Sequence, residues 1–496
     1  MSLINVSGLT FAYEGSFDNI FEDVSFRLDT DWKLGFTGRN GRGKTTFLKL
    51  LMGEYEYAGS ITASVGFEYF PYPVADPAQP TLAVVRGILP EVEDWALLRE
   101  LNLLAVDEAV LARRFDTLSK GEQTKVLLAV LFLKGNRFLL IDEPTNHLDL
   151  RGREQVSRYL NSKSGFILVS LDRAFLDGCV DHILSINRTN IEVQKGNFSS
   201  WYANKELRDN YELERNARLR KDIKRLEAAA RQSRQWADKV ESEKIGNIAH
   251  RDKYNECGGR AYIAEQSRRM QQRRKNLERR QNRAIDEKST LLKDIETSDD
   301  LKIRQLEYRS RRLVTFDGVS VDYGEGAVCS GVSFTVESGD RVALRGGNGS
   351  GKSSLIKLLL GADIPHTGEV KAGGGLKVSY VPQDASGLSG GLSEYASEYG
   401  LDESLFKAIL RKLDFSRVQF EKDMRDFSEG QKKKVLIARS LCEEAHLHIW
   451  DEPLNYVDVI SRIQIEELLT KFKPTMLFVE HDKAFCDNVA TKTVEL

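Results

Sequence analysis

One segment of the sequence has the residue types and spacing of a phosphate-binding loop. Gly38 to Lys44, followed by Thr45 and Thr46, matches the pattern G-x-x-x-x-G-K-[ST] between a strand-like stretch and a helical run. Glycines allow successive backbone N–H groups to point at phosphate, and the helix that follows adds its positive N-terminus. We therefore expect Lys44 to contact the β- and γ-phosphates of a nucleotide and Thr45 to bind Mg²⁺.

A second segment ends in two acids that suit phosphoryl transfer. The apolar run Phe138–Ile141 is typical of a buried parallel strand, and Asp142 and Glu143 follow at its carboxyl end, where α/β sheets bind ligands. We expect Asp142 to hold Mg²⁺ through water and Glu143 to polarise the attacking water, because this chemistry depends on positioning and charge stabilisation. Taken alone, the run fits equally well a strand followed by a solvated acidic turn.

Both motifs recur in the second half of the chain, in the same order. Lys352 follows Lys44 by 308 residues, and Glu452 follows Glu143 by 309. A repeat in register indicates two copies of one nucleotide-binding domain. The second loop and the second acidic strand end are Gly346–Ser354 and Leu447–Glu452.

A third short motif, which we call the signature, lies between each phosphate loop and its acidic strand end. Ser119 and Gly121 in the first half, and Ser428 and Gly430 in the second, open segments rich in Leu, Val and Ala. Each serine lies 23 residues before the aspartate of its strand end. A helix starting there would offer an anion a second N-terminus, although a simple helix cap also explains the pattern when it stands alone.

Phosphate loop, signature and acidic strand in this order resemble the ATP-binding-cassette ATPases. The resemblance implies an α/β fold of two tandem cassettes that pair within one monomeric chain and enclose two ATP molecules with Mg²⁺. The loop of one cassette would face the signature of the other. One site would then combine Lys44, Asp142 and Glu143 with Ser428 and Gly430, and the other Lys352, Asp451 and Glu452 with Ser119 and Gly121.

The resemblance also implies a full set of site residues, including two tyrosines that the family would stack on adenine or that are simply strand residues. The ATP-binding residues are Tyr13, Gly38, Asn40, Gly41, Gly43, Lys44, Thr45, Thr46, Ser119, Gly121, Tyr323, Gly346, Asn348, Gly349, Gly351, Lys352, Ser353, Ser354, Ser428 and Gly430. The metal ligands are Thr45, Asp142, Ser353, Gln383 and Asp451. The catalytic residues are Glu143, Glu452, His481 and Gln383.

The two sites are not equivalent. Gln383, which the family uses near Mg²⁺ and the attacking water, is matched in the first half by Tyr72. His481, the family's switch histidine, is matched by Leu171. Because a leucine side chain cannot hydrogen-bond a γ-phosphate or water, we expect both sites to bind ATP and the site with Glu452 to hydrolyse it faster.

Residues 201–310 form a different kind of segment, a charged linker between cassettes at 1–200 and 311–496. Apolar residues at steps of seven predict two packed helices, and glycines predict a turn at about 245–262, so we expect a helical hairpin. The heptad positions of its second arm are Ile263, Met270, Leu277, Ala284 and Leu291. In the first arm, a similar frame fits Leu219, Leu226 and Val240 but is broken by Ser233, and Ile223 and Ala230 lie on the adjacent apolar seam.

The linker is basic in an otherwise acidic chain. Its 28 Lys and Arg against 20 Asp and Glu give +8, whereas the whole chain is −2. Clustered cations gain affinity for phosphate by releasing counterions, so nucleic acid is favoured over the alternative of a solvated coiled-coil face. The expected RNA-binding residues are Arg268, Arg269, Arg273, Arg274, Lys275, Arg279, Arg280 and Arg283.

Two fused cassettes with a charged helical linker resemble the ABC-F group of ribosome-associated ATPases. The motifs at 142–149 and 451–458, with residues 2–13 and 67–73, resemble the branch that protects bacterial ribosomes against lincosamides, streptogramin A and pleuromutilins. This implies a cytoplasmic protein that docks on the bacterial ribosome in its ATP-closed state. The hairpin would contact large-subunit ribosomal RNA and transfer RNA of the P-site region, and its tip would displace drug directly or by shifting RNA.

Other functions stay open at this point. They are a housekeeping ABC-F translation factor, a fused ATPase subunit of a membrane transporter, a DNA-repair cassette protein and a scaffold that binds ATP without turnover. The five dispersed cysteines form no C-x-x-C pair, which favours a reduced cytoplasm and no zinc site. The N-terminus lacks the pattern of a secretory signal, and the longest apolar run, Val126–Leu133, is too short to span a bilayer.

Overall fold

The structure is a computed structural model in which the chain forms two compact units. The first unit comprises Met1–Trp201 together with Ser298–Leu496, and the second comprises Tyr202–Thr297. The residues it describes are 2–13, 19–146, 148–187, 190–246, 268–269, 272, 276, 279–280, 283, 305–324, 327–347 and 349–496. Asn348, Arg273, Arg274 and Lys275 therefore lie outside the described residues, as do the five heptad positions of the expected second arm.

The first cassette is built on a buried, mostly parallel sheet. Its strand order is β5-β6-β7-β3-β8-β9, in which only the β8–β9 pair is antiparallel. The strands are β3 (Lys33–Thr37), β5 (Gly66–Phe70), β6 (Arg137–Asp142), β7 (Phe166–Val169), β8 (His182–Asn187) and β9 (Asn190–Lys195). A separate antiparallel sheet has the order β2-β1-β4, from β1 (Leu3–Phe11), β2 (Phe21–Asp29) and β4 (Ala58–Thr62).

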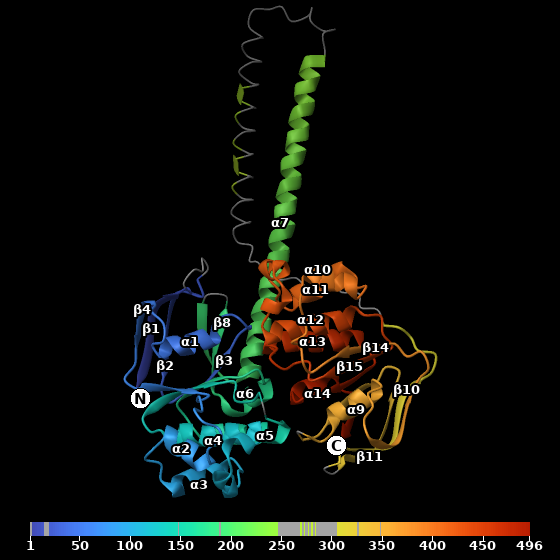
Figure 1. Cartoon of the computed structure of the whole chain (residues 1–496). Helices are drawn as coiled ribbons and strands as arrows, with labels where there is room; N and C mark the ends of the chain where they lie inside the picture. The colour runs from blue at the N-terminus through green and yellow to red at the C-terminus, as the bar shows by residue number, and fades with distance from the viewer. Residues whose placement is uncertain are drawn as a thin grey trace, which may run out of the picture. The chain divides into compact units, whose positions relative to one another are not determined.

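Helices cover this sheet and supply the loops of the site. Two of them, α2 and α3, pack against α4, the helix that begins at the first signature (Figure 1). The helices are α1 (Lys44–Leu51), α2 (Thr81–Ile88), α3 (Asp94–Leu103), α4 (Lys120–Leu133), α5 (Leu150–Asn161) and α6 (Arg173–Cys179).

The second cassette repeats this plan. Its parallel sheet has the order β14-β15-β16-β12-β17, from β12 (Arg341–Arg345), β14 (Val378–Val381), β15 (Leu447–Asp451), β16 (Met476–Val479) and β17 (Lys492–Glu495). Its antiparallel sheet has the order β11-β10-β13, from β10 (Arg312–Asp322), β11 (Ala327–Glu337) and β13 (His366–Ala372). Its helices are α9 (Lys352–Leu359), α10 (Leu392–Glu398), α11 (Glu403–Lys412), α12 (Glu429–Cys442), α13 (Val459–Phe472) and α14 (Lys483–Val489).

Burial explains why the apolar runs fold as parallel strands. All four residues of β7 and of β16 are buried, as expected where helices cover both faces of a sheet. In β6, the four residues Phe138–Ile141 are buried and the acids follow at the sheet edge. The sequence-based expectation of two α/β cassettes is confirmed.

The linker begins with one long helix, α7 (Phe198–Gly246), drawn in green in Figure 1. Leu219, Ile223 and Leu226 are half-buried while most of their neighbours are exposed, so the shielded stripe follows the predicted one. The expected tip is described only to Gly246, and residues 247–262 lie outside the described residues. Seven residues between 268 and 283 are described, all helical. Within the described residues, no helix has the length and apolar character needed to cross a membrane.

A buried polar network joins α12 to the neighbouring strands of the second cassette. Ser379 donates to Ser440 (2.8 Å), Trp450 donates to Ser440 (2.9 Å), and His448 Nδ1 lies 3.2 Å from the same hydroxyl. Ser440 is fully buried, and burial lowers the pKa of His448 to about 4. The first cassette has Leu139 and Leu131 at the positions of His448 and Ser440, so this network belongs to the second cassette alone.

Stability should therefore fall in mild acid because of His448. The unfolded chain protonates this imidazole below about pH 6.5. The folded chain does so only near pH 4, so stability present above pH 6.5 is lost as the pH falls towards 4. His448→Leu, which installs the residue of the first cassette, should remove this part of the acid sensitivity. Thermal unfolding midpoints of both proteins at pH 7.5 and pH 5 measure it, and an equal drop in the two would contradict the assignment.

Candidate active site

Each phosphate loop connects a central strand to a helix, and the last residue of the loop is a position that suits only glycine. β3 leads into α1 and β12 leads into α9. The residue before each helix, Gly43 or Gly351, has a left-handed backbone with φ of 92° or 87°. A Cβ on Gly43 would lie 2.5 Å from Ile20, so any side chain there would be both strained and crowded.

The two loop lysines fold over the backbone of their own loops. Lys44 Nζ donates to the carbonyls of Gly38 (2.7 Å) and Arg39 (3.1 Å). Lys352 Nζ donates to the carbonyls of Gly346 (3.0 Å) and Gly347 (2.7 Å). Both side chains are buried, which places a cation inside the ring of loop amides where a phosphate chain would lie.

A hydroxyl of each loop is hydrogen-bonded to the aspartate at the strand end. Thr45 donates to Asp142 (2.8 Å) and Ser353 donates to Asp451 (3.1 Å). Hydroxyl and carboxylate oxygens are ligands that Mg²⁺ prefers, and it commonly takes few from protein and the rest from phosphate and water. The oxygen pair in each cassette therefore fits a nucleotide-bound Mg²⁺.

The tyrosines expected at adenine lie beside the last hydroxyl of each loop. Tyr13 Oη is 2.8 Å from Thr46 Oγ1, and Tyr323 Oη is 3.0 Å from Ser354 Oγ. Both rings are exposed, which leaves a face available for stacking. The same placement in the two halves supports the adenine interpretation over that of an ordinary strand residue.

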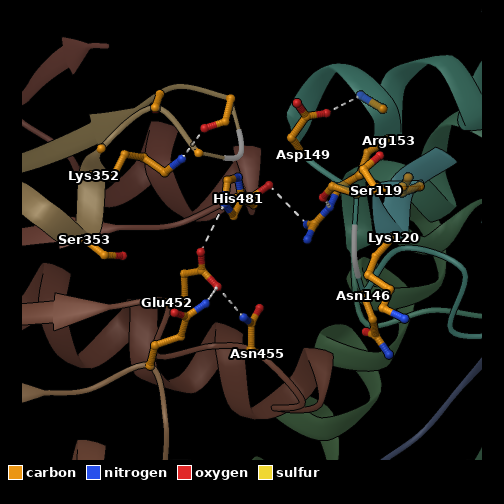
Figure 2. Close-up of a pocket in the computed structure, with 18 of the residues that line it drawn as sticks. Ser119, Lys120, Asn146, Asp149, Arg153, Lys352, Ser353, Glu452, Asn455 and His481 are labelled. Atoms are coloured by element: carbon orange, nitrogen blue, oxygen red, sulfur yellow. Dashed lines mark hydrogen bonds and ion pairs between the residues drawn. The ribbon is translucent and has the colours of Figure 1, made fainter. Parts of the chain in front are cut away.

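Each signature serine begins a helix, as its sequence predicts. Ser119 caps α4 and Ser428 caps α12, each in a capping box with the residue three positions on. In Figure 2, Ser119 and Lys120 lie across a cavity of about 1040 Å³ from Lys352 and Ser353. The first signature and the second phosphate loop thus line one cavity, as the cassette pairing predicts.

The reciprocal pair is also close. The side-chain amide of Asn40, in the first loop, donates to the carbonyl of Tyr456 (2.7 Å). A Cβ on Gly430 of the second signature would lie 3.0 Å from that amide nitrogen and 2.3 Å from the Tyr456 carbonyl. The glycine is therefore needed for this close approach.

Glu452 is held by three polar side chains. Gln383 and Asn455 donate to Oε2 (2.8 and 2.7 Å), and His481 Nε2 lies 3.5 Å from Oε1 (Figure 2). Burial alone would raise the pKa of Glu452, but these contacts, with His481 first among them, lower it to about 2. The carboxylate is thus ionised and oriented at neutral pH, as a group that polarises water requires.

Glu143 has a different environment. Its Oε2 atom is shielded from solvent and, among the described residues, has no hydrogen-bond partner. Burial, with the charge of Asp142 adding to it, raises the pKa of Glu143. Leu171 is buried where the second cassette has His481, and the ring of Tyr72 lies under the Lys134 ammonium (4.7 Å). Tyr72 makes no hydrogen bond to Glu143 in the described part of the chain.

Sequence reasoning missed two residues that contact the acids. Asn455 follows the second acidic pair by three residues, and its donation to Glu452 depends on how the chain turns after β15. Tyr69, on β5, donates to Asp142 (3.0 Å). Tyr69 lies three residues before Tyr72, the residue that matches Gln383, and its contact with Asp142 does not follow from that match.

The basic residues of the linker are placed in part. Arg268, Arg269, Arg279, Arg280 and Arg283 are helical and exposed. Their guanidinium groups are accessible to a phosphate backbone.

The chain is similar to known ATP-binding proteins. The ABC transporter family model matches residues 21–146 and 329–455. Ribosome protection protein VmlR of Bacillus subtilis (strain 168) is 28% identical over 98% of this chain and 85% of its own length. ATP-binding protein Uup of Caulobacter vibrioides is 28% identical over 96% of this chain and 74% of its own.

Solved structures share the fold. The archaeal ribosome recycling factor aABCE1, in complex with the archaeal ribosomal stalk protein aP1, superposes with a TM-score of 0.64 at 19% identity. The superposition covers 98% of this chain and 87% of that one. RNase-L Inhibitor gives a TM-score of 0.62 at 20% identity, covering 99% and 87%.

The unequal environments of Glu143 and Glu452 lead to a test. Glu452→Gln should lower ATP turnover about a hundredfold, because it removes the oriented carboxylate. Glu143→Gln should lower it less than about tenfold, because Glu143 lacks the polar partners of Glu452. Steady-state phosphate release measures both, with ATP binding as the control for loop integrity. A larger loss in Glu143→Gln would contradict the asymmetry.

Proposed function

The chain belongs to the ABC transporter family, and on that premise we propose that it is an ABC-F ATPase that binds the bacterial ribosome when ATP closes its cassettes. In this proposal it protects the ribosome, in the cytoplasm, from antibiotics that act at the peptidyl-transferase centre. The observation that best supports this proposal is the combination of two phosphate loops, each hydrogen-bonded to a strand-end aspartate, with a helical linker that exposes arginines.

The protein is an ATPase that uses ATP and Mg²⁺. We assign the nucleotide-binding roles to the two loops and signatures, and the orientation of water to Glu452 with Gln383 and His481. Ser353 and Asp451 would hold Mg²⁺, which when bound would supply neutralisation of phosphate charge during phosphoryl transfer. Lys352 and the loop amides would hold the phosphate chain.

Closure follows from where the negative charge of ATP is held. Ser119 and Lys352 line one cavity from opposite cassettes, so a nucleotide there contacts both. Two helix N-termini, those of α9 and α4, then face the same anion. Loss of the γ-phosphate removes the group that both contact and weakens the closed state, a shift driven by differential binding.

The ribosome as partner is supported by charge and by similarity. The linker carries +8 in a chain of −2, and five of its clustered arginines are exposed on helical backbone. Charge of this kind binds ribosomal or transfer RNA through phosphates. VmlR, which matches 98% of this chain, is named a ribosome protection protein. This similarity is also the reason for proposing drug protection, by displacement of drug directly or through RNA.

Two other functions make different predictions. A housekeeping ABC-F factor that relieves stalled ribosomes would bind the same partner but would not change drug sensitivity; Uup, a relative of comparable identity, is named only for ATP binding. A fused transporter ATPase would need a membrane subunit, and its linker would have no use for a cluster of exposed arginines.

Ribosome binding should require the closed state. The double variant Glu143→Gln, Glu452→Gln should hold ATP without turnover and co-sediment with bacterial ribosomes. Binding should weaken about ten- to a thousandfold between 50 and 200 mM salt, because phosphate contacts release counterions. The same variant with ADP is the control. Absence of co-sedimentation with ATP, in protein shown to be closed, would overturn the ribosomal proposal.

Drug protection should appear in growth. Bacteria that express the wild-type chain should tolerate higher concentrations of a lincosamide, streptogramin A or pleuromutilin than bacteria that express Glu452→Gln. An aminoglycoside, which acts on the small subunit, serves as the control drug. Ribosome binding without any change in tolerance would favour the housekeeping function.

A further inference from the structure

Lys433 is a buried cation close to the catalytic carboxylate of Glu452. It lies on α12, one turn after the signature glycine Gly430, and only 2% of it is exposed. Its ammonium donates to the carbonyl of Pro382 (2.9 Å) and to the carbonyl of Glu452 (3.2 Å). These two acceptors belong to the two segments that meet at the catalytic carboxylate.

Each acceptor controls the placement of one catalytic side chain. The carbonyl of Pro382 belongs to the peptide that begins Gln383, so fixing it fixes the backbone from which the Gln383 amide reaches Glu452. The backbone of Glu452 is left-handed, with φ of 47°, a strained conformation for a non-glycine residue that persists only when its surroundings hold it. The bond from Lys433 to the Glu452 carbonyl is one such support.

The helix that carries Lys433 is itself firmly anchored. Lys434 donates to Asp458 (2.7 Å) and to the carbonyl of Leu413 (2.9 Å), and Arg439 donates to the carbonyl of Tyr380. Ser440 joins the buried network with His448 and Trp450. Lys433 therefore holds Pro382 and Glu452 from a fixed position.

The first cassette provides the comparison. By the repeat, Thr124 stands where the second cassette has Lys433, and its hydroxyl donates to the carbonyl of Lys120 (2.9 Å). Thr124, Pro71 and Glu143 line a cavity of about 420 Å³. The corresponding three positions of the second cassette are joined by the Lys433 side chain. The carboxylate that receives side-chain hydrogen bonds, that of Glu452, is the one with this contact.

We propose that Lys433 is a positioning residue for ATP hydrolysis, which holds Gln383 and Glu452 in register by bridging the carbonyls of Pro382 and Glu452. This rests on the proposed function in one respect, that Glu452 serves the faster site. Lys433 acts through these two residues and is not among the residues that line the cavity between Ser119 and Lys352.

The first test removes the hydrogen-bond donor of Lys433 and keeps a side chain of similar length. Lys433→Met has a similar side-chain length without an N–H group. It should lower kcat for ATP roughly ten- to a hundredfold, the usual effect of losing an orienting partner, with KM changed less than about twofold. Thr124→Val is the matched control and should leave both constants within about twofold of wild type. An unchanged kcat in Lys433→Met would overturn the proposal.

The second test needs neither nucleotide nor turnover. In nucleotide-free Lys433→Met, backbone amides of residues 381–386 and 452–455 should exchange with deuterium faster than in wild type, because two anchoring hydrogen bonds are lost. The corresponding residues of the first cassette, 70–75 and 143–146, should exchange at the wild-type rate. Unchanged exchange at 381–386 and 452–455 would overturn the proposal, and equal acceleration in both cassettes would also do so.

A gain-of-contact variant covers the case in which Lys433→Met does not fold. Thr124→Lys should place an ammonium in the cavity beside Pro71 and Glu143 and slow amide exchange at 70–75. No slowing in folded Thr124→Lys protein would count against the bridging geometry.

Glu452→Gln, measured in parallel, distinguishes a failure of the faster-site assignment from a failure of the role given to Lys433. If it keeps wild-type turnover, the assignment of the faster site is wrong and the Lys433 proposal falls with it. If it loses turnover while Lys433→Met does not, only the Lys433 proposal is wrong.

Discussion

A hydroxyl-to-carboxylate hydrogen bond spans one intervening strand in each cassette, and the site depends on it. Thr45 follows β3 and Asp142 ends β6, with β7 between the two strands. Ser353 and Asp451 repeat this across β16. The contact is possible only because parallel strands bring all their carboxyl ends to one edge of the sheet. The loop glycines, the helix N-termini and the acids are then within reach of a single triphosphate.

The two cassettes keep this frame and differ in the side chains around it. Glu452 receives donors from Gln383 and Asn455, whereas Glu143 has a shielded oxygen with no partner in the described part of the chain. A partnered carboxylate remains ionised when buried, and an unpartnered one is driven towards its neutral form. Thus one frame supports two electrostatic environments, and the difference arises from a few substitutions in loops and helices that the sheet does not constrain.

The sequence predicted those parts of the site whose geometry is local. The loops, the signature caps and the strand-end acids each lie in one short segment whose backbone follows from residue type, and the repeat placed both copies. The repeat also showed that Leu171 occupies the position of His481 in the first cassette. Tyr69, Asn455 and Lys433 were not predicted. The contact of Tyr69 with Asp142 spans 73 residues and those of Lys433 span 19 and 51, so they depend on tertiary packing, and the contact of Asn455 depends on how the chain turns after β15. Lys433 stands in a run of three lysines, 432–434, which in the sequence resembles a solvated basic segment. Its burial is evident only in the folded structure.

The left-handed backbone of the two strand-end glutamates has a consequence for how this protein could tolerate change. Glu143 has φ of 51° and Glu452 has φ of 47°, so the duplication has kept the same strained peptide in both halves. In the second half that strain is matched by a carboxylate with three polar neighbours. In the first half the same strain, about 1–3 kcal/mol, accompanies a carboxyl group whose Oε2 has no hydrogen-bond partner among the described residues. At residue 143 an asparagine or glycine, both at ease in this conformation, therefore relieves strain at a smaller functional cost than at residue 452, where the same relief removes the group that the conformation exists to present.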